Sequence, residues 1–450
     1  MILYADDTCS FSKLTEDFLK ANKIKYQKIS IFDENCPQNV KESKIRPIIR
    51  VKDKWLYGPS YHELAEIYNI PIQEQVYYFD YAATTPLSSY INDAMYYINK
   101  NFHGNPSSQH QYGQRAYTIL ENSRKNIAKL LSCSPKEVIF TGSGSEANNL
   151  AIKGLAQANK DKGNHIIISC IEHKSILKAC DSLKKQGFRI SILPVDYCGN
   201  IDYECLRNEI CDETILVSVM IANNEIGVIQ DYKKIRKITR EKGVLFHADA
   251  VQALGHLNLN FSSLDLDAMT ISAHKIYGPK GIGALLCKEN VPLSPLISGG
   301  AQENNYRAGT ENIALIYGFD LALEERISKI DIVEEHLNKI KAYLISRIRS
   351  NIPNSIINSS EFNSLNNIVS ITFNACEIYD IAALLDFYGI CVSRGSACNL
   401  NEYSHVLKSI GLSEKNAKNT IRVSLGYNTT FSDVDYLVNT LTKVIKNFSI

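Results

Sequence analysis

Two side chains that end apolar segments of the sequence could together hold a carbonyl cofactor. Lys275 ends the run AMTISAHK, before the Gly/Pro-rich turn GPKGIG, and Asp249 ends the run VLFHAD. Parallel strands of an α/β sheet bring their carboxyl ends to one edge, where such sheets bind ligands, so we expect both side chains there. A lysine amine at this edge can form a Schiff base, although a lysine taken alone is more often a solvated strand-end residue.

Asp249 could keep a cofactor ring nitrogen protonated. An aspartate beside the pyridine nitrogen of pyridoxal 5'-phosphate lets the ring accept electrons from a substrate carbanion. A helix N-cap is the alternative for this aspartate on its own. The lysine and the aspartate at two strand ends favour the cofactor interpretation.

A Gly/Ser-rich turn offers a place for a phosphate. It has the sequence TGSGSE, from Thr141 to Glu146, and lies between the apolar run EVIF and a helical stretch that begins near Ala147. At Gly144 the backbone can approach an anion closely, the helix N-terminus presents free N–H groups, and the hydroxyl of Ser145 adds a donor. A flexible turn is the alternative for this segment alone.

Cys398 has the sequence surroundings of a reactive thiol. It lies in SRGSACNLNE, which predicts a loop between the run GICVS and a helix that starts near Ser404. A nucleophilic cysteine must be exposed and must ionise. A purely structural thiol is the alternative, and it better suits the cysteines in apolar or helical segments, namely Cys133, Cys170, Cys180 and Cys287.

The elements that must position these residues form two predicted domains after residue 76. Residues 77–330 alternate strand-like runs with helical stretches, which predicts an α/β domain around a mostly parallel sheet, with its first residues joining the smaller domain. The runs are VIF, HIIIS, ILVSVMIANN, VLFHAD, AMTISAHK and GALLC. Residues 331–450 begin with a charged helix from Val333 to Ser350, followed by strands around NIVSITFN, and form a smaller α+β domain.

Composition excludes several classes of function for these 450 residues. With 49 basic and 48 acidic residues the net charge is +1, so no overall field attracts nucleic acid or an anionic membrane. No apolar run approaches the length of a membrane span, and the N-terminus MILYADD lacks the basic region of a signal peptide. The twelve cysteines have the spacing of neither a disulfide scaffold nor a zinc site. We expect a cytoplasmic protein without a resident metal.

Eight segments of the chain, in order, resemble the cysteine desulfurase family. They are DYAATTP, GNPSSQH, EHKS, NNEIG, HADAVQALG, SAHKIYGPKGIG, RAGTEN and RGSAC, and they run from Asp80 to Cys398. The resemblance covers the chain from about Tyr78 to its end, and RGSAC is similar to the first of the two branches of the family. It implies a class V aminotransferase-like, fold type I enzyme that uses pyridoxal 5'-phosphate.

The resemblance implies a role for each matching residue. Lys275 would bind the cofactor and remove the Cα proton of L-cysteine, and the Cys398 thiolate would take the substrate sulfur as a persulfide, leaving L-alanine. The other implied roles are His173 stacked on the ring, Asp249 at the ring nitrogen, Gly144, Ser145, Ser272 and His274 at the phosphate, Gln252 at the phenolic oxygen, Asn224 between cofactor and substrate, Thr310 at the opposite subunit's phosphate, and Arg422 on the substrate carboxylate. A polar core histidine and a surface salt bridge are the alternatives for His173 and Arg422 taken alone.

The resemblance also implies partners. The family forms homodimers and passes sulfur to an acceptor protein, such as an iron–sulfur scaffold or a tRNA thiolation enzyme. Cys398 could also transiently ligate an iron–sulfur cluster. The stretch from Cys398 to Ser404 is slightly shorter than in the family, which bears on how far Cys398 reaches and on which acceptor it serves.

Residues 1–70 resemble a glutaredoxin of the thioredoxin fold, and residues 71–76 read as a linker. A strand precedes Thr8-Cys9-Ser10-Phe11-Ser12, which opens a helix, and Arg46-Pro47 precedes a hairpin. The helix dipole favours the thiolate of Cys9, a candidate redox or sulfur-relay residue. Ser12 replaces the second cysteine of a CxxC pair, so dithiol exchange within the motif is excluded. Docking without redox chemistry is the alternative for this unit.

Two other functions remain open from the sequence. One is a related enzyme of the same fold, an aminotransferase or a selenocysteine lyase, and an aminotransferase would not need Cys398. The other is a sulfur-carrier or docking protein that has kept the fold without activity. The joint presence of Lys275, Asp249, His173 and Cys398 argues against the second.

Overall fold

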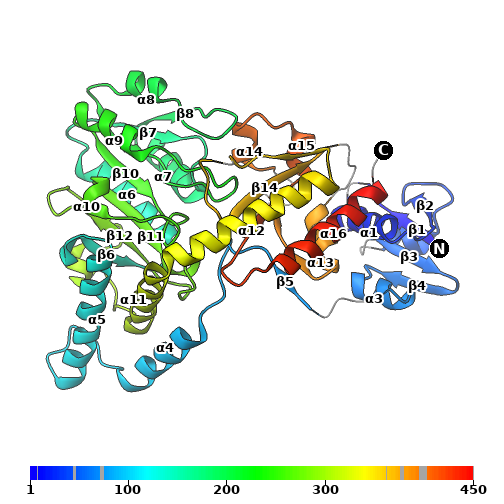
Figure 1. Cartoon of the computed structure of the whole chain (residues 1–450), viewed down its shortest axis with the longest axis horizontal. Helices are drawn as coiled ribbons and strands as arrows, with labels where there is room; N and C mark the ends of the chain where they lie inside the picture. The colour runs from blue at the N-terminus through cyan, green and yellow to red at the C-terminus, as the bar shows by residue number, and fades with distance from the viewer. Residues whose placement is uncertain are drawn as a thin grey trace.

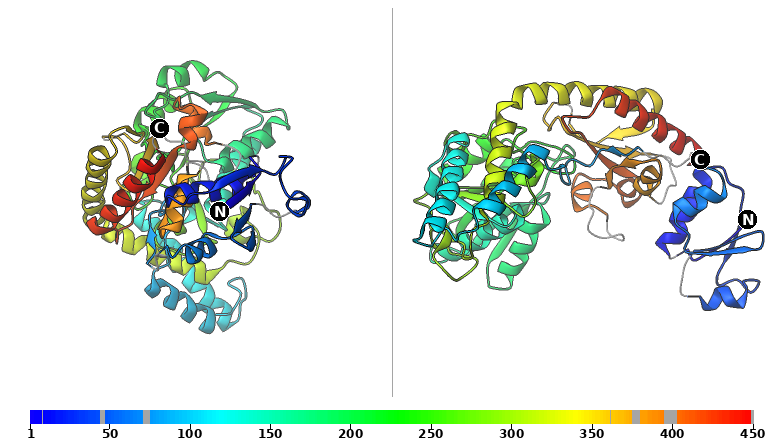
Figure 2. Two further views of the ribbon diagram at one scale, coloured as in Figure 1. Left: turned by 90° about the vertical axis from the view of Figure 1, so that its right-hand side faces the viewer. Right: turned by 90° about the horizontal axis from the view of Figure 1, so that it is seen from below.

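Three sheet-containing units are visible in the computed structural model, which describes residues 1–7, 9–43, 47–70, 75–360, 362–374, 380–394 and 403–448. The sheet of the C-terminal part lies between the large sheet and the N-terminal unit (Figure 1). The long helix α12 (Ile330–Asn351) runs from the large unit along the C-terminal one (Figure 2). The chain therefore passes from the N-terminal unit to the far end of the molecule and back.

The largest sheet has seven strands in the order β6-β12-β11-β10-β9-β7-β8. The strands are β6 (Val138–Thr141), β7 (His165–Ser169), β8 (Arg189–Leu193), β9 (Thr214–Ser218), β10 (Leu245–Asp249), β11 (Ala268–Ser272) and β12 (Gly283–Cys287). Neighbouring strands from β11 to β8 are parallel, whereas β12 is antiparallel to both of its neighbours. The predicted, mostly parallel sheet is confirmed, and β8 is an additional edge strand that was not predicted.

Helices cover both faces of this sheet. Alternate residues of β6 point to opposite sides, so Val138 and Phe140 join one hydrophobic cluster and Ile139 the other. Helices α6 (Gly144–Ala158) and α7 (Lys174–Lys184) bury their apolar faces on the Ile139 side. The opposite side packs against α4 (Ser89–Asn101), α5 (Gln111–Leu130), α8 (Tyr203–Glu209), α9 (Tyr232–Glu241), α10 (Phe261–Leu264) and α11 (Ile313–Ser328).

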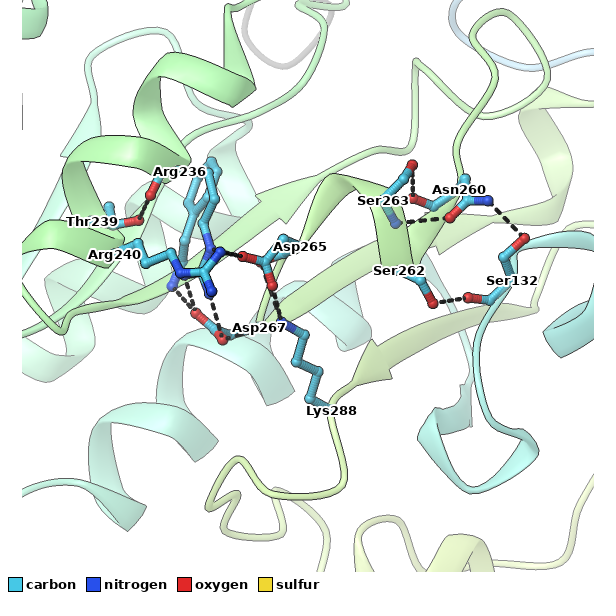
Figure 3. A network of polar contacts seen from close by, with 11 residues as sticks. Ser132, Arg236, Thr239, Arg240, Asn260, Ser262, Ser263, Asp265, Asp267 and Lys288 are labelled. Atoms are coloured by element: carbon cyan, nitrogen blue, oxygen red, sulfur yellow. Dashed lines mark hydrogen bonds and ion pairs between the residues drawn. The ribbon is translucent and has the colours of Figure 1, made fainter.

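An ion-pair network fixes the amino ends of β10 and β11 (Figure 3). The guanidinium of Arg236 on α9 contacts Asp265 at 3.0 Å and Asp267 at 2.9 Å, and Lys288 contacts Asp265 at 2.6 Å. Burial alone would raise the pKa of Asp265, but hydrogen bonds from Lys288 and Arg236 lower it to about 2. The carboxylate is therefore charged at neutral pH, and the network holds in register the two strands whose other ends carry Asp249 and Ser272.

The C-terminal unit has a four-stranded antiparallel sheet in the order β13-β14-β17-β16. Its elements are β13 (Ser355–Ile357), β14 (Ile368–Phe373), β16 (Ser393–Arg394), β17 (Thr420–Ser424), α12, α13 (Ile381–Phe387), α14 (His405–Ser409), α15 (Glu414–Lys418) and α16 (Phe431–Phe448). Strand β5 (Tyr77–Tyr78) pairs with β15 (Ile390–Cys391), so the segment after the N-terminal unit joins this part of the structure. The predicted helix near Ser404 is confirmed as α14, with Ser404 as its N-cap.

The N-terminal unit has a four-stranded sheet in the order β2-β1-β3-β4, with β1 and β2 parallel and the other pairs antiparallel. The elements are β1 (Ile2–Ala5), α1 (Ser10–Ala21), β2 (Gln27–Ser30), α2 (Gln38–Glu42), β3 (Ile48–Val51), β4 (Lys54–Tyr57) and α3 (Tyr61–Ile67). A capping box starts α3, because Ser60 and Glu63 exchange side-chain and backbone hydrogen bonds there.

Helix α1 packs against α13 and α16 of the C-terminal unit. Phe18 meets Phe387 edge to face with ring centroids 4.7 Å apart, and the hydroxyl of Tyr388 donates to Asn22 at 3.2 Å. Apolar residues of both units form one hydrophobic cluster. The N-terminal unit is thus packed onto the C-terminal unit through a buried apolar surface. None of the helices in the described part of the chain has the length and hydropathy of a membrane crossing.

Candidate active site

A cavity of about 350 Å³ lies at the carboxyl edge of the large sheet, beside β16 and β17. The predicted residues in its lining are Gly144, Ser145, His173, Asn224, Asp249, Gln252, Ser272, His274, Lys275 and Arg422. They come from turns after five strands of the large sheet and from β17 of the C-terminal unit. One site thus receives residues far apart in sequence.

Lys275 ends a short 3-10 turn that directly follows β11. Its Nζ donates to the carbonyl oxygens of Ala82 at 2.5 Å and Ala83 at 2.7 Å. Burial, together with the positive charge of Arg422, lowers the pKa of this amine to about 7. A large share of Lys275 is therefore neutral at physiological pH, which an amine needs in order to act as a nucleophile or a base.

Asp249 is the last residue of β10 and is only 5% exposed. Its carboxylate accepts hydrogen bonds from Nδ2 of Asn148 at 2.7 Å and from the backbone N–H of Val251 at 2.9 Å. Asn148 also donates to Ser175 at 2.9 Å, and Ser175 contacts Nδ1 of His173 at 2.8 Å. A chain of polar contacts therefore links the carboxylate to the imidazole.

His173 is the N-cap of α7. Its Nδ1 accepts a hydrogen bond from the backbone N–H of Ser175 at 3.2 Å, so the proton of the neutral ring is on Nε2. Burial lowers the pKa of this imidazole, although the charge of Asp249 opposes the shift. A neutral ring at the cavity wall suits stacking on a flat cofactor.

The N-terminus of α6 fits a phosphate. Ser143 caps the helix by accepting from the backbone N–H of Glu146 at 3.1 Å, and the next helical N–H groups face the cavity edge at Gly144 and Ser145. A Cβ on Gly144 would lie 2.9 Å from Val251 and 3.3 Å from Ser272, so only glycine allows this close packing. Backbone donors, a serine hydroxyl and a helix dipole form a donor set for an anion.

Arg422 on β17 closes the cavity on the side of the C-terminal unit and is 5% exposed. Nη1 donates to the carbonyl oxygen of Asn224 at 2.8 Å, and Nη2 contacts Oδ1 of Asp80 at 2.7 Å. Its buried Nε has no partner among the described residues. The described contacts use two of the five N–H donors of this guanidinium, so Arg422 at the cavity wall is suited to bind a ligand carboxylate.

Cys398 lies outside the described residues, as do Thr8 and Arg46 of the N-terminal motif. The described residues on either side of the Cys398 segment are anchored. Arg394 forms an ion pair with Asp380, and the hydroxyl of Ser404 donates to Glu225. Burial raises the pKa of Glu225 to about 7. Since Glu225 also lines the cavity, Ser404 lies at the cavity wall.

Two predicted residues lie away from the cavity. Thr310 is exposed and is not part of the cavity lining, and Cys9 is the N-cap of α1 in the N-terminal unit. Ser12, one turn into α1, is 1% exposed and accepts from the backbone N–H of Asp6 at 3.3 Å. The burial of Cys133, Cys180 and Cys287 raises each thiol pKa to about 12, which keeps these thiols protonated as expected for structural cysteines.

Sequence reasoning missed several residues of the site. They are Asp80, Asn148, Glu172, Glu225 and His405. Four of the five lie in or beside segments that carried other predictions, namely DYAATTP, EHKS, NNEIG and the helix after TGSGSE. The available signal was a polar residue inside an otherwise apolar helix or strand end. Burying such a residue without a partner is costly, so its presence indicates a polar contact in the fold.

Comparison with known proteins places the chain among aminotransferases of class V, whose family model matches residues 77–437. A protein described as cysteine desulfurase IscS from Dictyoglomus turgidum is 43% identical over 371 residues, which is 82% of this chain and 94% of that protein. Another cysteine desulfurase IscS, from Methanosarcina thermophila, is 40% identical over 381 residues, with 84% of this chain and 94% of that protein covered.

Solved structures agree with this likeness. A NifS-like protein superimposes with a TM-score of 0.78 at 33% identity, covering 83% of this chain and all of the other. A NifS-like protein from Rickettsia africae gives a TM-score of 0.75 at 33% identity, with 83% of this chain and 100% of the other covered. The α/β architecture is therefore that of the pyridoxal-phosphate enzymes of fold type I.

Proposed function

Because the chain belongs to the class V aminotransferase family and resembles its cysteine desulfurases over most of its length, we propose that it converts L-cysteine to L-alanine and carries the sulfur as a persulfide on Cys398. One observation carries the proposal. Lys275, Asp249, His173 and Arg422 come from separate elements yet line a single cavity. A sulfur-carrier that had lost its activity would not need all four.

The family uses pyridoxal 5'-phosphate, and the residues of the cavity fit it. The N-terminus of α6, with Ser145, Ser272 and His274, would hold the phosphate. Asp249 would meet the ring nitrogen, and Gln252 the phenolic oxygen. Bound in this way, the cofactor withdraws electrons from the substrate carbon next to the amino group.

The residues of the chain then have distinct tasks. Arg422 would hold the substrate carboxylate at the cavity wall, and Asn224 fixes Arg422 through a backbone carbonyl. Lys275, with a pKa of about 7, would take the Cα proton. The Cys398 thiolate would attack the substrate sulfur; the Cβ–S bond breaks and its electron pair stays with carbon. Protonation of Cβ and return of the proton from Lys275 to Cα then complete alanine. The sulfur leaves as a persulfide instead of free sulfide.

We propose that this sulfur supplies iron–sulfur cluster assembly or tRNA thiolation through an acceptor protein in the cytoplasm. A homodimer in which Thr310 reaches the partner's cofactor is part of the proposal, supported by the exposure of Thr310. Exposed tyrosines on α4 and α5 support it too, because large exposed aromatic side chains favour interfaces. They are Tyr90, Tyr96, Tyr97, Tyr112 and Tyr117.

For the layout of the chain we propose a glutaredoxin-like domain over residues 1–70, a linker over 71–76, a cofactor-binding domain over 77–330 and a small domain over 331–450. The N-terminal sheet, with one parallel and two antiparallel pairs, supports the first of these, as does Cys9 at the start of a helix. Cys9 would act as a one-thiol redox or relay residue.

The test of the proposed function begins with visible absorption of the purified protein and release of alanine from L-cysteine. Cys398→Ser should keep the cofactor absorption but form no persulfide, because a serine hydroxyl cannot accept the sulfur. A related aminotransferase would keep its turnover in this variant. Robust alanine formation by Cys398→Ser would therefore reject the assignment of Cys398.

A further inference from the structure

The segment from Phe79 to Ala83 meets two cations of the cavity at once. The carboxylate of Asp80 lies 2.7 Å from Nη2 of Arg422, and the carbonyl oxygens of Ala82 and Ala83 accept from Lys275. Hydrogen bonds to β17 hold this segment in place. Ser424 donates to the carbonyl oxygen of Phe79 through its backbone N–H at 2.7 Å, and the Ser424 hydroxyl accepts from the backbone N–H of Ala82 at 2.9 Å.

Arg422 therefore has an acidic partner before any substrate arrives. The guanidinium side chain is 5% exposed and the carboxylate side chain 22% exposed, so water screens the pair weakly. The contact uses one N–H of Nη2, and one N–H of Nη1 is used by Asn224, so Arg422 keeps further N–H donors at the cavity wall. The guanidinium can thus meet a second carboxylate without releasing Asp80.

We propose that Asp80 makes this site bind zwitterionic α-amino acids more tightly than simple carboxylic acids, an inference that rests on the proposed function. With Asp80 in contact, Arg422 is already neutralised. A substrate carboxylate on Arg422 adds one negative charge, which the substrate's own α-ammonium group balances. A carboxylic acid without that group leaves two carboxylates around one guanidinium, and like charges at such short range repel strongly.

Glu225, another carboxyl of the cavity lining, also interacts with the charge of Arg422, but burial raises its pKa to about 7, so it is partly protonated at neutral pH. Asp249 has its own donors, Asn148 and Val251. Lys174 acts on Glu225, whose pKa it lowers against the effect of burial. His274, with its pKa lowered by burial to about 4, is neutral. Asp80 also acts on Lys275, whose pKa burial lowers to about 7, so this amine is partly neutral near pH 7.

The experiment compares two ligands that differ only in the α-ammonium group, L-alanine and propionate. Their dissociation constants are measured from the change in visible absorption of the holoenzyme, without turnover. In Asp80→Asn we expect propionate to bind at least about 10-fold more tightly, since one carboxylate charge is gone. The dissociation constant of L-alanine should change less than about 3-fold, because lost ammonium attraction offsets the gain. Covalent contributions to alanine binding cancel when each variant is compared with the parent enzyme.

Asp80→Glu, which keeps the charge, should preserve the original preference, and so should the control Asp161→Asn in an exposed loop after α6. An equal change for both ligands in Asp80→Asn would overturn the proposal, because it would mean that Asp80 only occupies or orients Arg422. The proposal would also be overturned if Asp80→Glu changed the binding of the two ligands as Asp80→Asn does. Failure of the parent enzyme to form alanine from cysteine would instead reject the proposed function, since the binding comparison needs no turnover.

Discussion

Nδ2 of Asn148 lies 2.7 Å from Oδ2 of Asp249, so a residue one turn into α6 supports a carboxylate at the end of β10. The same amide nitrogen donates to the hydroxyl of Ser175, which in turn contacts Nδ1 of His173. The helix that offers its N-terminus to a phosphate thus also orients the expected partner of the ring nitrogen.

Replacing Asn148 should weaken cofactor binding. Asn148→Leu removes a hydrogen bond to a charged group, an interaction that contributes about 1.5–3 kcal/mol, so the cofactor dissociation constant should rise about 10-fold or more. Titration of apoenzyme with pyridoxal 5'-phosphate measures this change. Gln157→Ala, on the exposed side of α6, is the control. Unchanged affinity in Asn148→Leu would show that Val251 alone suffices to hold Asp249.

Covalent capture of the cofactor should depend on pH through Lys275. The pKa of this amine is lowered to about 7, and only the neutral amine attacks a carbonyl. The rate of capture by apoenzyme should therefore rise with pH up to about 7 and level off above it. Stopped-flow absorption follows the reaction, and Lys275→Ala should show no such phase. A rate still climbing at pH 9 would mean that the amine keeps its usual basicity.

Glu172 should make stability depend on pH. Its carboxyl is fully buried, receives hydrogen bonds from Ser169 at 2.5 Å and the backbone of Met220 at 2.9 Å, and has a pKa raised by burial to about 8 from 4.5. The protonated form is favoured in the folded state, so its stabilisation is complete below pH 4.5 and is lost as the pH rises through 8. Relative to the parent, Glu172→Gln should gain thermal stability between pH 5 and pH 9. Parallel melting curves at all pH values, as expected for exposed Glu204→Gln, would contradict this.

Cys9 should take part in sulfur or electron transfer if the N-terminal unit is more than a docking domain. After one turnover with sulfur-labelled cysteine, peptide mass mapping should find label on Cys9 as well as on Cys398. Ser12 cannot resolve a persulfide on Cys9, so the label should persist there. Label confined to Cys398, with transfer to every acceptor unchanged in Cys9→Ser, would leave docking as the role of the unit.

Dimerisation and activity should be coupled through Thr310. The double variant Tyr96→Glu with Tyr97→Glu introduces two negative charges on the exposed side of α4. This variant should sediment as a monomer and bind pyridoxal 5'-phosphate more weakly. Thr310→Ala should lower that affinity without changing the dimer. A monomer with full activity would refute the coupling.

Local patterns predicted the elements well where each strand is buried on both sides. The runs HIIIS, VLFHAD and GALLC became interior strands of the large sheet, and VIF became the edge strand β6, whose residues are all buried. Strand β8 was missed because it is an edge strand with only Leu193 buried, so its hydrophobic signal is weak. The short helices α2 and α10 have too few residues for their apolar positions to show a helical period.

The site was predictable in type but not in its internal contacts. Motif residues at strand ends indicated which groups meet, since a parallel sheet collects them at one edge. The contacts of Asp80 with Arg422 and of Asn148 with Asp249 join residues 342 and 101 positions apart. The first pairing depends on how the small unit packs against the large unit, and the second on how α6 packs on the large sheet; no local pattern encodes either.

The single hydrophobic cluster shared by α1, α13 and α16 has a consequence for how the molecule unfolds. Removing residues 1–70 would expose to water the part of Phe387 that Phe18 covers. Burial of apolar area is the main source of folding free energy, so the two units should melt in one cooperative transition. The N-terminal unit would then serve as a folding partner of the catalytic part, whatever chemistry its cysteine performs.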